Sequence, residues 1–582
     1  MKQFFKILFA SLFGAILALG IIVGLVVLIS IKSIPTDTPS YADKNVLLLQ
    51  NVVSVGEVTV PELPTIFSNG EISQLGLSDI LRALEIASND DKISGIVLEN
   101  VTIDAGYPTV GELAAAIQKF RQKGKFVVSY NHTLSQKSYL LSSGANEIVM
   151  NSEGMAEFHG ISSTSVHYKN LLEKVGLKPV VIRCGKYKSY VESVTQEKMS
   201  DENRMQKQVY IDKVWKQYGA DVAKHRPILV SQLNSFADSI LICTPQQLLS
   251  FGFIDKIQYA DEFWDSVKVR MGLKLDESVS TISLRGYIKS NQTKIALDTT
   301  RKSNVALILA QGSIDLGKSD EKSIGSETYC KIFKKVREDS SIKAVVFRIN
   351  SGGGSALASE LIWREVSLTA VKKPVIVSMG DVAASGGYYI ATPATAIVAS
   401  PSTLTGSIGV FGMSMTAEGL LNKIGVNVDK VNTHPHSDFG NISRDMDPVE
   451  VKAIQNMIDK TYKTFKTRVS EGRHLPLVLV EEIAQGRVWS GADAKERGLV
   501  DTLGGLDVAL QMAAKASNLG KNYGIKMYPQ APSLFDMMSS TLEAKTSVLA
   551  KLTDDKNFQS LLRTIPTKSG VYMQLPYNFT IE

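Results

Sequence analysis

Two stretches of the chain decide its fold: KFVVSYNHTLSQKSYLLSSGANEIVMNSEGMAEFHGIS at residues 125–162 and KPVIVSMGDVAASGGYYIATPATAIVASPSTLTGSIGV at residues 373–410. From Val127 onward they align without a gap at an offset of 249, so that Tyr139 falls on Tyr388 (388 − 139 = 249). The match continues upstream, where ISGIVLE is repeated as IKAVVFR in the same register. A period this long is that of whole domains rather than of stacked short repeats, so the chain contains one domain twice.

Within each copy, short apolar runs alternate with helical stretches. Runs rich in valine and isoleucine, such as VALILA at 305–310 and PVIVSM at 374–379, are typical of buried parallel strands. The stretches SETYCKIFKKVREDSS at 326–341 and ASELIWREVSLTAV at 358–371 predict helices between them. Such alternation indicates an α/β fold in which helices cover the sheet.

These patterns divide the chain into four segments. We predict an N-terminal anchor, a first repeat with connecting helices, a second repeat and a C-terminal arm, at 1–32, 45–295, 300–520 and 521–582. The polar stretch from about Asp201 to Phe236 has helical spacing and is expected to bridge the first repeat to the rest. After Gly520 the periodicity is lost, so the arm is expected to be peripheral.

The N-terminus carries the longest apolar stretch in the sequence. The 25 residues between Lys6 and Lys32, ILFASLFGAILALGIIVGLVVLISI, contain no charge. As a helix they would extend about 37 Å, which is enough to cross a bilayer core of about 30 Å. A cleaved signal peptide usually has a much shorter apolar stretch, so we predict a permanent single-pass membrane anchor.

Composition argues against several other classes of function. The formal net charge of +6 is small for 582 residues and forms no dense basic stripe, so nucleic acid is not an expected partner. The three cysteines lie far apart and show no Cys/His spacing of a zinc site. We expect neither a metal nor a cofactor.

A glycine-rich turn, RINSGGGS, falls between a predicted strand and a predicted helix and includes Gly353. Glycines allow a backbone to approach a ligand closely, and free N–H groups there can stabilise an anion. Acyl transfer needs such donors for its oxyanion. A nucleotide-binding loop is less favoured, because neither G-K-[ST] nor G-x-G-x-x-G is formed.

Two serines beside glycine are candidate nucleophiles: Ser385 in MGDVAASGGYYIA and Ser407 in PSTLTGSIGVFG. Either one needs a base within hydrogen-bond reach. His434 in THPHSD would give a Ser–His arrangement, although this stretch is also typical of a solvated loop. Lys188 in RCGKYKSYVES would give a Ser–Lys arrangement, with Lys186 as a competing lysine.

The duplication favours the Ser–Lys arrangement. At the offset of 249, Ser407 falls on Phe158 and Lys188 falls on Ser437 (407 − 249 = 158; 188 + 249 = 437). Each copy therefore has one member of a Ser–Lys pair and lacks the other. We predict a single site per chain, built between the two halves, with the hydroxyl from the second copy and the amine from the first.

Four motifs together resemble the long, tandem-domain form of the bacterial signal peptide peptidase A family, also called protease IV: STLTGSIGVFG, MGDVAASGGYYIA, RINSGGGS and GKYKSYVE. The resemblance runs from the N-terminal anchor to about Gly505. It implies two domains of the Clp protease/crotonase fold, with Ser407 as nucleophile, Lys188 as general base and Gly353 as an oxyanion donor. The family's turn reads Asn-Ser-Pro-Gly-Gly; here Gly352 replaces the proline, which leaves the N–H of Gly353 in place.

The resemblance also implies a serine endopeptidase of the bacterial inner membrane that faces the periplasm or the outside, degrades remnant signal peptides through an acyl-enzyme and assembles as a tetramer. A lysine base must be neutral, so we expect burial at the domain interface to lower its pKa from about 10.4. Three alternatives stay open: a Ser385–His434 protease of the Clp type, a membrane-tethered scaffold without catalysis, and a crotonase-like acyl-CoA enzyme.

Overall fold

The computed structural model describes residues 14, 43–59, 74–239, 242–291, 295, 304–320, 322–520, 523–529 and 570–574. The expected anchor at residues 1–32 lies outside these ranges, apart from the single residue Gly14. None of the helices within the described ranges combines the length and the apolar character that crossing a bilayer requires.

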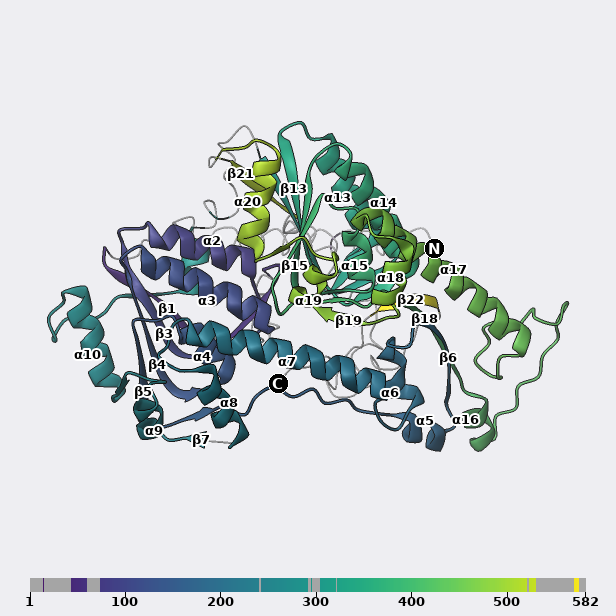
Figure 1. Ribbon diagram of the computed structural model, residues 1–582, viewed down its shortest axis with the longest axis horizontal. Helices are drawn as coiled ribbons and strands as arrows, with labels where there is room; N and C mark the ends of the chain where they lie inside the picture. Colours follow the sequence, from purple (N-terminus) through teal and green to yellow (C-terminus); the bar gives the residue numbers. More distant parts are fainter. Residues whose placement is uncertain are drawn as a thin grey trace.

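The first repeat folds around a mainly parallel, eight-stranded sheet, which lies on the left of Figure 1. Its main path has the order β2-β1-β3-β4-β5-β7, with β8 beside β5 and β9 beside β1. Helices α2 (Leu77–Ser88), α3 (Tyr107–Gln122) and α4 (Gln136–Ser142) pack on it through buried apolar side chains. The strands are β1 (Asn45–Gly56), β2 (Leu75–Gly76), β3 (Ile93–Asp104), β4 (Phe126–Leu134), β5 (Glu147–Glu157), β7 (Ile242–Cys243), β8 (Lys256–Ile257) and β9 (Thr281–Ser283).

The second repeat has a corresponding eight-stranded sheet, of order β19-β17-β15-β13-β10-β21, with β16 beside β15 and β20. Helices α13 (Ser326–Glu338), α14 (Ala356–Ala370), α15 (Gly386–Ala391) and α20 (Leu506–Ala516) cover it. The strands are β10 (Asn304–Gln311), β13 (Ile342–Ser351), β15 (Val375–Ala384), β16 (Ala396–Ala399), β17 (Leu404–Gly406), β19 (Val488–Ser490), β20 (Thr502–Leu503) and β21 (Gly524–Tyr528).

The structure confirms the predicted duplication and α/β class. At the offset of 249, β3 corresponds to β13, α3 to α14 and β4 to β15. The predicted strands at 305–310 and 374–379 lie within β10 and β15, and the predicted helices are α13 and α14. The valine- and isoleucine-rich runs form strands because other strands flank them and helices cover them, so both faces are buried.

A third sheet joins strands from both halves of the chain. Its order is β12-β11-β14-β22-β18-β6. Strand β6 comes from the first repeat and pairs antiparallel with β18 of the second, from Val410 opposite Cys184 to Thr416 opposite Lys178. The strands are β6 (Lys178–Cys184), β11 (Ser313–Asp315), β12 (Ser323–Gly325), β14 (Gly353–Ser355), β18 (Val410–Thr416) and β22 (Gly570–Gln574). Because of this pairing, the segment that follows β6 lies against the second repeat.

Helix α7 (Asp201–Ala223) bridges the two repeats, as the sequence predicted for this region. It begins at Ser200, whose side chain accepts a hydrogen bond from the backbone N–H of Asn203. Figure 1 shows α7 running from beside α4 of the first repeat to α6 (Glu192–Thr195), below the sheet of the second repeat, and it contacts α3 and α4 at one end and β19 at the other. Helix α8 (Val230–Asp238) then folds back against it.

A buried group of charges fixes the two repeats together. Arg348 on β13 is fully buried, with its Nε 3.0 Å from Glu57 Oε2 and its Nη2 2.9 Å from Glu112 Oε1 on α3. Burial raises the pKa of Glu57, and the guanidinium of Arg348 opposes that rise. Asp381 on β15 accepts a hydrogen bond from Gly106 N, where α3 begins, at 3.0 Å. Removing one partner of a buried ion pair typically costs about 3–5 kcal/mol, so these contacts hold the two halves in a defined position.

The C-terminal region contributes to the sheets more than the sequence indicated. Strand β21 pairs in parallel with β10, from Asn304 opposite Gly524 to Ile308 opposite Tyr528, so the second repeat extends beyond the expected limit at residue 520. Strand β22 lies inside the third sheet, between β14 and β18. The remaining residues of the expected arm fall outside the described ranges.

Candidate active site

Three neighbouring parallel strands deliver the predicted residues of the second repeat to one edge of its sheet. Strand β13 leads into Gly353, β15 into Ser385 and β17 into Ser407. Strand β15 pairs in parallel with β17, with Ala384 opposite Gly406, so the two serines leave the sheet side by side. The carboxyl ends of parallel strands meet at one edge, which is where α/β proteins place their sites.

Lys188 reaches this edge from the first repeat, in the loop that follows β6. The loop packs closely on the second repeat: a Cβ on Gly486 would lie 2.7 Å from Lys188 Cβ. Gln206 on α7 donates to Tyr187 O at 3.1 Å and accepts from Val488 N at 3.2 Å. Helix α7 therefore clamps the lysine loop to the strand β19 that borders the site.

The side chain of Lys188 meets both serines. Its Nζ lies 2.7 Å from Ser385 Oγ, 3.0 Å from Ser407 Oγ and 3.1 Å from the backbone oxygen of Ser407. The structure thus brings an amine from the first half to two hydroxyls of the second, across 197 and 219 residues of sequence.

All three side chains are shielded from water. Lys188 and Ser407 are 1% exposed and Ser385 is 0% exposed. Burial lowers the pKa of Lys188 well below its ordinary value of 10.5, because the ammonium form loses its hydration. A lysine in this state can hold a lone pair near neutral pH, which is the requirement for a general base.

Counting hydrogen-bond donors limits how the amine can be used. A neutral amine has two N–H donors and one lone pair. The backbone oxygen of Ser407 can only accept, so it takes one N–H. The other N–H and the lone pair remain for the hydroxyls of Ser385 and Ser407, and the hydroxyl that donates to the lone pair is the one that can be activated.

The backbone is strained at both serines. Ser385 has φ 55° and ψ −116° and stands between β15 and the first residue of α15. A non-glycine residue with positive φ is strained, typically by about 1–3 kcal/mol, and such strain clusters at functional sites. Ser407 also has a positive φ, of 52°, but its N–H donates to Arg487 O at 2.7 Å.

A carbonyl oxygen already lies beside Ser385. A Cβ on Gly353 would be 2.0 Å from the backbone oxygen of Met573 and 2.6 Å from Gly386 N, so only glycine allows this approach. Gly353 has φ 97°, and its own N–H donates to Ser351 Oγ at 3.1 Å. Gly386 N, which follows Ser385 directly, is in the first turn of α15 and has no partner within that helix.

The other candidate bases lie elsewhere. His434 is exposed, and its hydrogen bonds are to Thr433 and Ser437 in its own loop. Lys186 is exposed, with its Nζ 5.2 Å from the ring centre of Tyr187. The Clp-type alternative drawn from the sequence paired Ser385 with His434. In the structure, the side chain beside Ser385 is Lys188.

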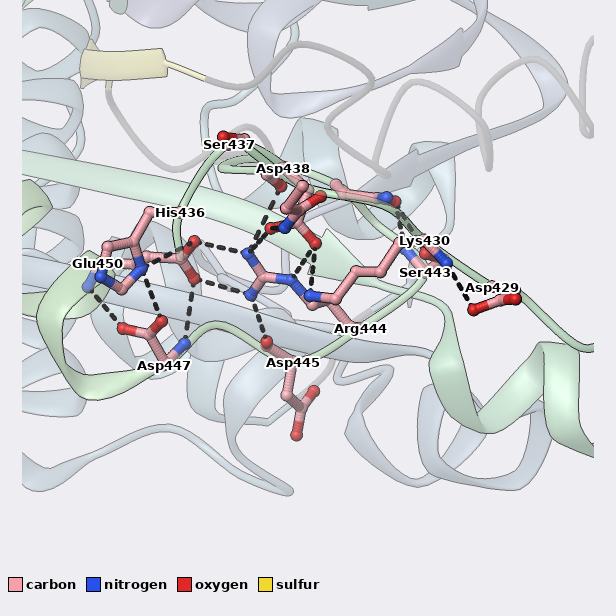
Figure 2. Close-up of polar contacts among 12 residues, drawn as sticks. Asp429, Lys430, His436, Ser437, Asp438, Ser443, Arg444, Asp445, Asp447 and Glu450 are labelled. Carbon is pink, nitrogen blue, oxygen red and sulfur yellow. Dashed lines mark hydrogen bonds and ion pairs between the residues drawn. The ribbon is translucent and has the colours of Figure 1, made fainter. Parts of the chain in front are cut away.

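The loop that contains His434 is held by an ion-pair network, shown in Figure 2. Arg444 donates to both carboxylate oxygens of Glu450, at 2.6 and 2.8 Å, and to Asp438 at 2.7 and 2.9 Å. His436 Nδ1 lies 2.9 Å from Asp447 Oδ2. Hydrogen bonds from Arg444 lower the pKa of Glu450. The guanidinium neutralises the carboxylates that a cation would need, so this cluster fixes the start of α17 (Pro448–Arg473) rather than forming a metal centre.

In the first repeat, the positions that correspond to the two serines are occupied by other buried side chains. At the offset of 249, Ser385 corresponds to Gln136 (385 − 249 = 136), which is buried. Its Oε1 accepts from the backbone N–H groups of His159 and Gly160, both at 2.9 Å. Phe158, the counterpart of Ser407, is also buried. In the first repeat a glutamine therefore stands where the second repeat has Ser385, and its side-chain oxygen accepts both of these N–H groups. The first repeat has no nucleophile at this position.

A buried contact between a lysine and two serines, at the edge of a parallel sheet, defines a serine hydrolase of the α/β class. The chain belongs to peptidase family S49: the model of "Peptidase family S49" matches residues 119–274 and 367–520, once in each repeat. It is therefore a serine peptidase.

Similar proteins agree with this assignment. The chain is 36% identical to "Protease 4" of Salmonella typhi, over 82% of this chain and 77% of that protein. It is 32% identical to "Serine protease SPPA, chloroplastic" of Arabidopsis thaliana, over 86% and 74%. A solved structure, "ClpP1 from Listeria monocytogenes", matches 34% of this chain and 91% of that chain at 16% identity, with a TM-score of 0.22.

Proposed function

We propose that the protein is a membrane-bound endopeptidase that cleaves peptides through a serine–lysine dyad, with Ser407 as the nucleophile and Lys188 as the general base. The observation that carries this proposal is the 3.0 Å contact between Lys188 Nζ and Ser407 Oγ in a site closed to water. The motif STLTGSIGVFG around Ser407, which resembles that of the signal peptide peptidase A family, supports the choice of this serine over Ser385.

The oxyanion of acyl transfer forms next to the nucleophile, so its donors must lie there too. The N–H groups of the two serines are already bonded, that of Ser385 to Gly406 O at 2.8 Å and that of Ser407 to Arg487 O at 2.7 Å. A Cβ on Gly353 would lie 2.6 Å from Gly386 N, so these two glycines lie close together at the same edge of the sheet. We propose that the backbone N–H groups of Gly353 and Gly386 stabilise the oxyanion.

In the proposed reaction, Ser407 Oγ donates its proton to the lone pair of Lys188 and attacks the peptide carbonyl carbon. The backbone N–H groups of Gly386 and the Gly353 turn stabilise the oxyanion. The C–N bond then breaks and the protonated Lys188 gives its proton to the leaving amine. Water, deprotonated by Lys188, hydrolyses the acyl-enzyme, and Lys188 returns the proton to Ser407.

Ser385 acts in this scheme as the residue that orients the amine. The hydroxyl oxygen of Ser385 and the backbone oxygen of Ser407 accept the two N–H groups of neutral Lys188, at 2.7 and 3.1 Å. With both donors occupied, the lone pair is directed at Ser407 Oγ, 3.0 Å away. Ser189, the residue after Lys188, is paired with Gln206 Nε2 at 3.1 Å.

A serine-directed acylating probe, such as a fluorophosphonate, tests which serine is the nucleophile. We expect the adduct on Ser407 and none on Ser385, with labelling lost in Lys188→Ala. Chymotryptic digestion before mass spectrometry separates the two serines, because Tyr388 and Tyr389 lie between them. An adduct on Ser385 would reverse the assignment, and undiminished labelling of Lys188→Ala would exclude the lysine as base.

We further propose that the substrates include remnant signal peptides and other short or unfolded peptides. The support is the motif resemblance to signal peptide peptidase A and the 25-residue uncharged stretch at 7–31, which would place the enzyme at a bilayer. The expected location is the bacterial inner membrane, with the two repeats on the periplasmic or outer side.

We also infer a homo-oligomer, from the repeat symmetry of the third sheet. At the offset of 249, β6 corresponds to residues 427–433 and β18 to residues 161–167, yet neither counterpart is a strand. Val431 is fully exposed and Val166 is 52% exposed. Because β6 pairs with β18 within the chain, residues 427–433 of one chain would pair in the same way with residues 161–167 of a second copy, and repetition of this contact closes a ring, a tetramer in the related family.

Replacing Val431 with aspartate tests the ring. We expect the mass in solution to fall from that of the oligomer to that of a single chain, because a charge would enter the new strand pair. Val371→Asp is the matched control, since Val371 is 86% exposed after α14 and lies in neither segment. A monomeric wild-type protein, or a Val431→Asp variant with the mass of the oligomer, would contradict this contact in light scattering.

A further inference from the structure

The place of Lys188 Nζ depends on the loop that carries the lysine. Lys188 lies between β6 and the single turn η1 (Ser189–Val191), outside any strand or helix. A lysine side chain is flexible, so its amine stays at one place only if the backbone beneath it is fixed. Proton transfer needs the amine within about 2.6–3.2 Å of the hydroxyl, and a misplacement of about 1 Å can lower the rate about 100-fold. Whatever fixes this loop therefore affects the reaction.

A single buried side chain, Gln206 on α7, binds the loop on both sides of the lysine. Its Nε2 donates to the backbone oxygen of Tyr187 and to Ser189 Oγ, both at 3.1 Å. Its Oε1 accepts from the backbone N–H of Val488 in β19 at 3.2 Å. Gln206 is 3% exposed, so water has little access to these bonds. One amide group thus connects the residues before and after Lys188 to a strand of the second repeat.

The strand at the other end of this connection borders the nucleophile. Val488 stands opposite Gly406 of β17, and Ser407 follows Gly406 directly. The N–H of Ser407 donates to the backbone oxygen of Arg487, the residue before Val488, at 2.7 Å. The path of contacts from the base to the nucleophile therefore runs through the amide of Gln206 and the Arg487–Val488 segment.

The beginning of α7 is itself bound to the segment that follows the lysine. Glu192, the first residue of α6, is 1% exposed and accepts from Ser200 Oγ at 2.6 Å and from Asn203 Nδ2 at 2.9 Å. Arg183 Nη1 lies 3.7 Å from Glu192 Oε1 and donates to the backbone oxygen of Lys188 at 3.1 Å. These contacts hold the helix at a defined place beside the lysine loop.

We propose that Gln206 is a positioning residue for the general base, whose amide holds Lys188 at the distance from Ser407 that proton transfer requires. This inference rests on the proposed function, which gives Lys188 the role of base. The hydrogen bonds of Gln206 are to the loop and to β19 rather than to the amine, so it acts through the backbone and takes no proton. Its loss should therefore slow the chemical step and leave peptide binding unaltered.

Gln206→Leu removes these hydrogen bonds and keeps a similar side-chain volume. We expect kcat to fall about 10- to 100-fold, with KM within about twofold of wild type. The rate of labelling by the fluorophosphonate should fall by the same factor, because the probe needs the same activated serine but no peptide. The pH at which kcat/KM levels off should move upward, since water that reaches a displaced amine favours the ammonium form and raises the pKa of Lys188.

Gln208→Leu is the matched control. Gln208 lies on the same helix but is exposed, and its Nε2 donates to Asp212 Oδ1 within α7 at 2.8 Å. The same substitution at this position should leave kcat, the labelling rate and the pH profile within about twofold of wild type.

Ser189→Ala is a second variant that gives a result even where Gln206→Leu fails to fold. It removes one acceptor of Gln206 and keeps the bonds to Tyr187 and Val488. The labelling rate should fall by a smaller factor, about two- to tenfold. Adding Ser189→Ala to Gln206→Leu should cost little more, because the contact between the two side chains is already lost.

A wild-type labelling rate and pH profile in Gln206→Leu would overturn the inference, and so would the same result in Ser189→Ala where only that variant folds. Equal losses in Gln206→Leu and Gln208→Leu would also overturn it, since they would show a general effect of α7. The proposed function is judged on the wild-type protein alone. A wild type that neither takes the probe nor cleaves peptides contradicts that function and the inference with it, whereas an active wild type with unaffected variants contradicts only the role of Gln206.

Discussion

Replacing Ser407 with alanine is expected to lower kcat by about 10⁴-fold or more, because the enzyme loses the oxygen that attacks the peptide carbonyl. Replacing Ser385 with alanine should lower kcat much less. That change removes one of the two acceptors that hold Lys188, while the backbone oxygen of Ser407 at 3.1 Å remains. A hydrogen bond of this kind contributes about 1.5–3 kcal/mol, which corresponds to roughly 10- to 100-fold in rate.

The control for both variants is Ser402→Ala. Ser402 is 3% exposed in the same repeat, and its Oγ contacts Ser400 Oγ at 3.2 Å. Its loss should leave kcat and KM within about twofold of wild type. If Ser385→Ala were the inactive variant and Ser407→Ala retained a tenth of the activity, Ser385 would be the nucleophile and Ser407 the residue that orients the amine. Hydrolysis of a quenched fluorescent peptide under single-turnover conditions measures each rate.

The domain organisation could be predicted because duplication is visible as a fixed register. Valine- and isoleucine-rich runs recur at the offset of 249, and they form β3 and β13, or β4 and β15, because burial on both faces selects the same residues in both copies. The meeting of Lys188 with the second repeat could also be predicted, since each copy lacks one partner of the pair. These inferences depend only on residue type and spacing.

The duplication alone does not assign roles to the two serines. Ser385 corresponds to Gln136 and Ser407 to Phe158, so neither serine has a serine as its counterpart and the offset does not distinguish them. Their surroundings are also alike: both hydroxyls contact Lys188, and both backbone N–H groups are bonded, to Gly406 O and Arg487 O. The proposed roles therefore rest on the motif around Ser407, and labelling by the acylating probe tests them.

Strand β22 could not be predicted from the sequence, for a different reason. Five residues, GVYMQ, carry too little periodicity to predict a strand on their own. They form one because β14 and β18 supply partners on both sides, and those partners lie about 160–220 residues earlier in the chain. The local sequence pattern contains no information about strand pairing over such a distance along the chain.

Replacing Lys188 with methionine should abolish peptide hydrolysis, by about 10⁴-fold or more, while the chain folds and assembles normally. Methionine fills a similar volume and has no lone pair with the basicity to accept the proton of Ser407. Because the serine and the lysine act as one unit, the double variant Ser407→Ala/Lys188→Met should be little slower than either single variant. Lys188→Arg is the matched control for charge, since a guanidinium stays protonated and should be equally inactive at every pH.

The pH dependence tests the state of the amine directly. Activity requires neutral Lys188, so kcat/KM should rise with pH, about tenfold per unit, and level off above the pKa of the lysine, which burial places well below 10.5. Stability should change in the same direction. Between the folded pKa and 10.5 the unfolded chain binds a proton that the folded chain does not, so the free energy of unfolding rises with pH.

The comparison with Lys188→Met isolates this contribution. The free energy of unfolding of wild type minus that of Lys188→Met should increase by up to about 1.4 kcal/mol per pH unit over this window, measured by urea unfolding at several pH values. Below the folded pKa both states carry the proton and the difference should be constant. A difference that fell as pH rose would show a lysine that is charged in the folded protein. Such a lysine holds no lone pair for Ser407, and the nucleophile would then need another base.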